Sequence, residues 1–126
     1  MTAPSKLFAL ALSLGTLTVG CRSTNAYEVG RDAEAVGLVV QNDNFADIDI
    51  YAVASGLGTR VGTVPGGTTQ RFDLSSSVYN ASDLRIVGAP IGGNGRASTG
   101  SIVVHRGNVI HFTIAPLISA SSVTVQ

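Results

Sequence analysis

The chain has 126 residues, which is enough for one small domain with a single core. Charged residues make up only 13% of the chain and the formal net charge is zero, so the sequence offers no basic surface for nucleic acid and no attraction to an anionic membrane surface. A single cysteine excludes a disulfide within one chain, while 15 glycines and the absence of tryptophan fit an exported β-domain with many turns better than a helical protein.

The first 20 residues have the layout of a secretory signal peptide. Lys6 supplies the positive charge, an apolar run (LFALALSL) follows at residues 7–14, and small residues continue to Gly20. The apolar run is too short to cross the hydrocarbon core of a bilayer as a helix, which takes about 20 apolar residues. The pattern therefore predicts a segment that is removed after export.

The only cysteine, Cys21, closes the run LTVGC at residues 17–21. This run resembles the lipobox of bacterial lipoproteins. The resemblance implies that the Cys21 thiol carries diacylglycerol, that the chain is cut just before Cys21, and that the new amine receives a fatty acid such as palmitate. In that family an aspartate after the cysteine favours retention in the inner membrane. Arg22 follows the cysteine here, so the resemblance implies delivery to the outer membrane. The alternative is ordinary cleavage that leaves a free thiol.

Residues 22–35 hold most of the early charge and show no sustained periodicity, which is typical of a tether. A flexible segment of this length has a reach on the order of 20 Å. We therefore expect a signal peptide at residues 1–20, a lipidated N-terminus and flexible tether at residues 21–35, and a β-sandwich domain at residues 36–126. The domain would stand in the periplasm or at the cell surface.

From residue 36 onward the hydrophobic pattern has a period of two, which indicates strands. The first expected strand covers residues 36–41, and an Asn-Asp-Asn sequence that favours a turn follows it. Residues 46–53 alternate clearly, because Ile48 and Ile50 fall on one face and aspartates on the other. This split is typical of a half-buried antiparallel strand.

Two hairpins and one separate strand are expected in the remainder. The first hairpin covers residues 60–74 and turns at a Pro-Gly-Gly sequence, and a separate strand follows at residues 84–88. The second hairpin covers residues 101–115 and turns at an Arg-Gly-Asn sequence. Its inward residues would form one apolar stripe of Ile102, Val104, Ile110, Phe112 and Ile114.

Seven short strands without an amphipathic helix predict an all-β fold, a single antiparallel two-sheet β-sandwich of immunoglobulin-like or transthyretin-like type. The motifs Asn-x-x-Phe at residues 42–45, RVGTV at residues 60–64, LRI at residues 84–86 and PIGG at residues 90–93 resemble small lipoproteins of environmental bacteria. The resemblance covers most of residues 36–115. It implies a location in the cell envelope and a sandwich fold, and it implies no activity.

Two features could begin a ligand site. The glycine-rich sequence PIGGNGR at residues 90–96 lacks the Lys-Ser/Thr ending and the helix of a phosphate-binding loop, which favours a plain connection between strands. His105 and His111 are expected on the same outward face of neighbouring strands, where they could begin a zinc site. A third ligand is missing from the local pattern, so solvated histidines are the simpler interpretation.

Oxygen-bearing side chains gather around the start of the strand at residues 46–53, as calcium requires, but the EF-hand spacing is absent. The simpler interpretation is that these residues form turns and place charges on an edge strand. They are Asn42, Asp43, Asn44, Asp47 and Asp49.

The serines at residues 75–77 and 119–122 lack the Gly-x-Ser-x-Gly context of a nucleophile. We therefore expect no enzyme, no metal and no cofactor other than the covalent lipid on Cys21.

Two functions remain as hypotheses. The first is a non-catalytic, lipid-anchored interaction or structural module that docks on a partner protein of the envelope, by a sheet face or by strand addition. The uncharged residues 121–126 could supply that strand, or residues 116–126 could hold an eighth strand of the same domain. The second is a small-ligand or carbohydrate binder at residues 90–96, which clustering of Tyr51 and Tyr79 beside that loop would favour.

Overall fold

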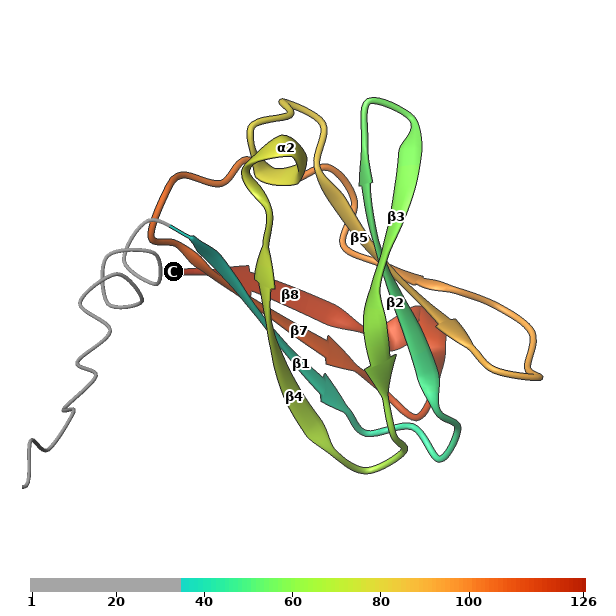
Figure 1. Cartoon of the computed structure of the whole chain (residues 1–126). Coiled ribbons are helices and arrows are strands. Elements are labelled where there is room, and N and C mark those ends of the chain that lie inside the picture. Colours follow the sequence, from blue (N-terminus) through green and yellow to red (C-terminus); the bar gives the residue numbers. More distant parts are fainter. Residues whose placement is uncertain (1–34) are drawn as a thin grey trace, which may run out of the picture.

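A computed structural model describes residues 35–126 as two four-stranded β-sheets packed face to face (Figure 1). The all-β sandwich is thereby confirmed, with eight strands in this part of the chain instead of about seven. The expected signal peptide, Cys21 and all of the expected tether except its last residue lie outside the described residues. Within residues 35–126 no helix has both the length and the apolar character to cross a membrane.

The strands are short and are joined mostly by tight turns. In chain order the elements are β1 (Val36–Asn42), β2 (Ile48–Ala54), β3 (Leu57–Val64), β4 (Thr69–Leu74), α2 (Ser76–Tyr79), β5 (Arg85–Pro90), β6 (Ala97–Ser98), β7 (Val109–Ile114), the 3-10 helix η1 (Ile118–Ala120) and β8 (Ser122–Val125).

One sheet has the strand order β4-β1-β7-β8 and the other has the order β3-β2-β5-β6. All neighbouring strands are antiparallel except β1 and β7, which run parallel with Leu38 opposite Ile110. The first sheet is therefore mixed, a feature that the local sequence pattern did not indicate. Parallel neighbours need a long connection, and here the chain builds the whole second sheet between β1 and β7.

The core lies between the two sheets and is formed by alternate residues of the strands. In β2 the residues Ile48, Ile50 and Ala52 are buried as expected, and in β5 Ile86 is buried. Phe112 of β7 is among the largest side chains enclosed there, with 1% of its surface exposed. Period-two alternation places these side chains on one face of each sheet, so the predicted inward faces are confirmed.

The expected hairpin at residues 60–74 is wrong, although both of its strands exist. β3 belongs to one sheet and β4 to the other, so the Pro-Gly-Gly sequence turns a corner between the sheets. A side chain at Gly66 would drive its Cβ into the carbonyl oxygen of Phe45, which explains why this corner needs glycine. A proline and glycines mark a sharp turn in either case, and the local sequence does not distinguish a hairpin from a corner.

The expected hairpin at residues 101–115 is also wrong. Only Ile102 makes a sheet contact in the first half, as an isolated bridge to Leu84, and the chain then crosses to the opposite sheet. β7 already has β1 on one side and β8 on the other, so no edge remains for residues 101–105. Val104 and Ile110 are still buried, because the crossing segment also covers the core.

A hairpin that the sequence analysis missed joins β2 to β3. Ser55 and Gly56 form its two-residue turn with φ angles of 52° and 77°, which match the twist of antiparallel strands. The Ser-Gly pair between two β-prone runs is the sequence feature that could have predicted this hairpin. β3 consequently begins at Leu57, three residues before the expected start at Arg60.

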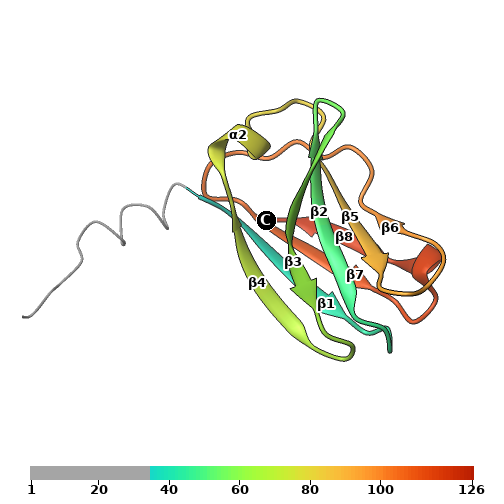
Figure 2. The ribbon, with the colours of Figure 1, turned by 45° about the vertical axis from the view of Figure 1, so that its right-hand side comes forward.

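The strands run between two ends of the sandwich (Figure 2). We call the end at which the described chain begins β1 the proximal end; it carries the Ser55-Gly56 turn, α2 and residues 101–108. The opposite, distal end carries the connections at residues 42–47, 65–68, 91–96 and 115–121.

Candidate functional site

The distal end is organised around a buried asparagine. Asn42 ends β1 with none of its surface exposed, and its Nδ2 donates to the carbonyl oxygens of Ala46 (2.9 Å) and Val64 (3.0 Å). Its Oδ1 accepts the backbone N–H of Asn44 at 3.0 Å. The amide therefore uses both donors and one acceptor inside the protein, and it joins β1 to the end of β3 and fixes the β1–β2 loop.

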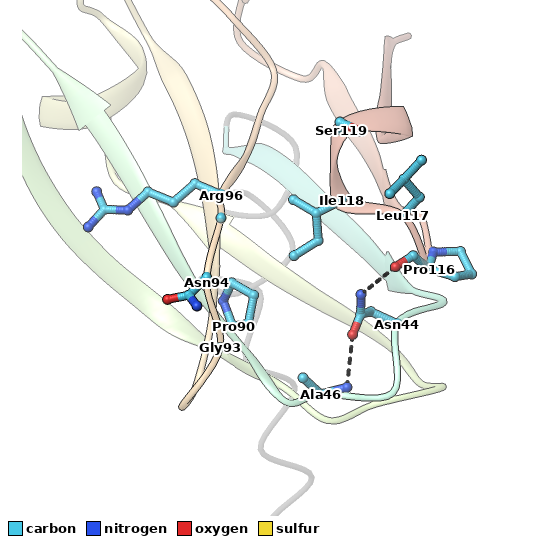
Figure 3. Close-up of a pocket in the computed structure, with 11 residues that line it drawn as sticks. Asn44, Ala46, Pro90, Gly93, Asn94, Arg96, Pro116, Leu117, Ile118 and Ser119 are labelled. Carbon is cyan, nitrogen blue, oxygen red and sulfur yellow. Dashed lines mark hydrogen bonds between the residues drawn. The ribbon is translucent and has the colours of Figure 1, made fainter.

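A second asparagine links this loop to the segment that follows β7. Asn44 Nδ2 donates to the Pro116 carbonyl at 2.9 Å, and Asn44 Oδ1 accepts the N–H of Ala46 at 3.0 Å (Figure 3). The loop between β5 and β6 is joined in turn, because the Ile91 N–H donates to the Asp47 carbonyl at 2.9 Å. Three connections distant in sequence thus form one hydrogen-bonded platform at the distal end.

The oxygen atoms considered for calcium are used inside the protein. Asp47 Oδ1 accepts the N–H of Gly66 at 3.0 Å, and Asp43 accepts both hydrogen bonds from the Gln41 side chain. Asp49 pairs with Arg60 and Thr63 on the neighbouring strand. Residues 35–126 contain no group of three or more histidine, cysteine or acidic side chains arranged to hold a metal ion. The turn-forming interpretation fits Asn42, Asp43, Asn44 and Asp47, but the expected edge strand is wrong, because Asp49 lies in β2 between β3 and β5.

Three large apolar side chains stand out from the platform. Phe45 is 97% exposed, Leu117 is 69% exposed and Ile91 is 55% exposed. Each lies beside a residue of the hydrogen-bond network just described. We call Phe45, Ile91 and Leu117 the distal apolar tip.

A hollow of about 470 Å³ lies at this end of the sandwich (Figure 3). Asn44 and Ala46 line one part of it, and the glycine-rich loop and the segment after β7 complete the wall. The Asn44 amide is already occupied by its backbone partners, and the other polar residues of the lining are Asn94, Arg96 and Ser119. The full lining is Asn44, Ala46, Pro90, Gly93, Asn94, Gly95, Arg96, Pro116, Leu117, Ile118 and Ser119.

A second hollow, of about 350 Å³, lies on the outer face of the β3-β2-β5-β6 sheet. Its lining is Tyr51, Val53, Gly58, Val87, Ala89 and Arg96. Arg96 therefore lines both hollows, and in Figure 3 its side chain points away from Leu117 and Ile118. Tyr79 does not join Tyr51, because it lies in α2 at the proximal end with 8% of its surface exposed. The clustering of Tyr51 and Tyr79 that would have favoured the ligand-binding hypothesis is thus absent.

Near the second hollow, Asp49 and Arg60 form an ion pair, whereas Arg96 has no partner among residues 35–126. Asp49 accepts hydrogen bonds from Thr63 Oγ1 at 2.5 Å and from the Arg60 guanidinium at 2.9 Å. The Thr63 bond, and after it the Arg60 bond, lowers the pKa of Asp49 below its usual value. Arg96, in contrast, makes no ion pair or hydrogen bond through its side chain within residues 35–126.

The two histidines do not lie on neighbouring strands, which corrects the sequence-based expectation. His105 lies in the turn before β7, where its N–H donates to Asn108 Oδ1 at 2.7 Å. His111 lies in the middle of β7, opposite Val39 of β1 and Thr124 of β8. The correction follows from the crossing of residues 101–105 between the sheets.

Several of the serines considered as nucleophiles have hydrogen bonds in local turns. Ser75 and Ser77 share a hydrogen bond between their hydroxyls at 3.0 Å. Ser121 Oγ donates to the Ile118 carbonyl at 2.8 Å and accepts the N–H of Ala115 at 3.2 Å. Ser121 thereby shapes the turn through η1 into β8.

Residues 116–126 form the turn through η1 and an eighth strand of the same domain. β8 pairs with β7 in antiparallel register, with Val123 opposite Phe112, and Val109 and Gln126 exchange backbone hydrogen bonds. The sequence left open whether residues 116–126 pair with a partner protein or hold an eighth strand of the same domain. In the structure they hold the eighth strand.

Comparison with known proteins gives little further guidance. No family model matches the chain, and no curated protein matches it. Among solved structures, the NMR structure of a protein from Eubacterium rectale is similar with a TM-score of 0.46 and 12% sequence identity, covering 73% of this chain and 88% of that one.

Proposed function

We propose that the protein is a non-catalytic, lipid-anchored protein of the bacterial cell envelope that presents its distal apolar tip to a membrane-associated partner protein. The anchor is the lipid on Cys21, and the tether of residues 22–35 holds the domain away from the bilayer, with the outer membrane as the favoured location. The domain acts as an interaction or structural accessory module.

The exposure of Phe45 carries this proposal. Its side chain is 97% exposed although the loop around it is fixed by the amides of Asn42 and Asn44. A rigid aromatic side chain loses little conformational entropy when a partner covers it, and such residues often dominate the binding energy of an interface. Leu117 and Ile91 add two further exposed apolar side chains from other loops of the distal end.

The direction of the strands adds support. β1 begins at the proximal end and finishes at Asn42, so the distal apolar tip lies opposite the point at which the chain leaves the tether. An anchor attached before β1 therefore leaves the tip facing away from the attachment point. A domain with this polarity can contact a second protein while its own lipids stay in the bilayer.

A second candidate function is a small-ligand-binding lipoprotein. The hollow of about 350 Å³ that combines Tyr51 with Arg96 favours it, because the glycine-rich loop supplies an arginine beside an aromatic ring. The absence of tryptophan from the sequence argues against a carbohydrate as the ligand, since sugar sites usually stack rings on aromatic platforms.

Site-specific crosslinking in intact cells tests the docking proposal. A photoreactive phenylalanine derivative replaces Phe45, Leu117 or, as the matched control, Leu57, which is 73% exposed at the proximal end. We expect one discrete adduct of the same size from positions 45 and 117 and none from position 57. Equal labelling from all three positions, or no adduct from positions 45 and 117, would contradict the proposal.

A further inference from the structure

We propose that the hollow on the outer face of the β3-β2-β5-β6 sheet binds a small carboxylate with a compact apolar body, such as an aromatic or branched-chain acid. The inference rests on the second candidate function and names its ligand class; the site is separate from the distal apolar tip, so it does not depend on the proposed docking.

The register of the strands creates the hollow. Tyr51 and Val53 point outward from β2, because the residues between and beside them, Ile50 and Ala52, are buried. Val87 of β5 lies opposite Tyr51 on one side of β2. Gly58 of β3 lies opposite Val53 on the other side and contributes no side chain. The absence of a side chain at Gly58 leaves a depression beside Val53 on this sheet face.

The lining combines an apolar floor with two unused hydrogen-bond donors. Val53, Val87 and Ala89 supply the aliphatic surface. The Tyr51 hydroxyl and the Arg96 guanidinium have no hydrogen-bond or ion-pair partner within residues 35–126. Both can donate to an anion, and a guanidinium presents paired N–H groups that match the two oxygens of a carboxylate.

The charge of the hollow selects an anion. Arg60, the neighbouring cation on β3, is neutralised by Asp49, whereas no carboxylate of the described residues pairs with Arg96. The apolar floor in turn selects a ligand with a hydrophobic body over a bare inorganic anion, because burial of that body adds to the binding free energy. The volume of about 350 Å³ lies at the small end of the range for small-molecule sites.

Gly58 offers a variant that closes the hollow without strain. A Cβ built there meets nothing closer than Val53 Cγ2 at 3.9 Å, and valine is favoured in strands. Gly58→Val therefore keeps the fold and fills the space beside Val53. Arg96→Gln removes the cation from an exposed loop, and Arg71→Gln on β4 of the opposite sheet removes the same charge as a matched control.

The experiment titrates the ¹⁵N-labelled protein in the form in which it is isolated from cells, membrane-bound or soluble, with phenylacetate and with isovalerate, and follows the amide resonances. We expect saturable shifts at Val53, Gly58, Val87 and Arg96, with phenylacetamide binding at least about tenfold more weakly because it lacks the charge. Gly58→Val and Arg96→Gln should each weaken phenylacetate binding by about tenfold or more, and Arg71→Gln should leave it unchanged.

Three results would overturn the proposal. The first is the absence of saturable shifts with either acid up to about 10 mM. This concentration is about tenfold above a Kd of about 1 mM, which corresponds to a binding free energy of only about −4 kcal/mol. The second is equal binding of phenylacetate and phenylacetamide. The third is unchanged binding in both Gly58→Val and Arg96→Gln, whose folded state the same spectra report.

Discussion

At the scale of single residues, Asn42 holds β1, the β1–β2 loop and the end of β3 together at the distal end. Its sequence context, Asn-Asp-Asn after a strand, fits both a turn and a set of calcium ligands. The structure shows that its amide satisfies the carbonyl of Val64, which lies 22 residues further along the chain. A local sequence pattern cannot reveal a partner so far along the chain. The sequence therefore indicated a turn here but not that the Asn42 amide fixes it.

We expect Asn42→Ala to lower the free energy of unfolding by about 2–3 kcal/mol, because it leaves the carbonyls of Ala46 and Val64 without their buried donor. Chemical denaturation followed by circular dichroism measures the change. Asn94→Ala, at an exposed position of the same end, is the matched control and should stay within about 0.5 kcal/mol of the wild type. Equal stability of the two variants would show that the Asn42 network contributes little.

Inward-facing residues were the most predictable part of the structure. Ile48 and Ile50, and likewise Ile110 and Phe112, were placed in the core from alternation alone, and all four are buried. Alternation is a property of two or three neighbouring residues, and a pleated strand converts it directly into faces. The apolar tip was not predictable in this way, since Phe45 in isolation reads like any other large apolar residue near a turn.

At the scale of elements, the strands were predictable and their pairing was not. Both expected hairpins contained real strands or buried segments, yet β4 pairs with β1 and β7 pairs with β1 and β8. The sequence between Val64 and Thr69 marks a sharp turn, and the choice between hairpin and corner depends on which sheet has a free edge. That choice is made by contacts between residues far apart in the chain.

β8 gives a testable consequence of this topology. Val123 packs partly buried against the core, whereas Val125, two residues later on the same strand, is 37% exposed. We expect Val123→Ala to lower the free energy of unfolding by about 1 kcal/mol and Val125→Ala by less than about 0.5 kcal/mol, because fewer buried methyl groups are lost.

Equilibrium denaturation of both valine variants measures this difference. If neither substitution changed the midpoint, β8 would not contribute to the stability of the sandwich. The tail would then be available to pair with another protein, as the alternative interpretation of residues 116–126 holds.

At the scale of the whole molecule, composition together with the period-two pattern indicated the fold class. Frequent glycine, few charges and seven β-prone runs predicted a single two-sheet sandwich, and the described residues form one. The candidate sites were harder to predict from the sequence, because each of them combines loops or strands that are far apart in the chain and meet only in the folded structure. Arg96 is the clearest case, since the sequence placed it in a glycine-rich loop and the structure brings it to the same hollow as Tyr51.

The proposed function links two features at opposite ends of the molecule. The lipid on Cys21 would precede the proximal end, and the distal apolar tip of Phe45, Ile91 and Leu117 lies at the other. An anchored domain with an exposed, rigidly supported aromatic residue at its free end is suited to hold a partner near the membrane. The proposed function depends on the anchor at Cys21, so the anchor is its central claim.

Intact-protein mass spectrometry of the chain recovered from membranes tests that claim most directly. We predict a mass that corresponds to a chain beginning at Cys21 and carrying two or three acyl chains, and we predict that a Cys21→Ala variant is not retained by membranes. A soluble chain with an unmodified thiol at Cys21 would contradict the lipid anchor and would favour the ligand-binding function.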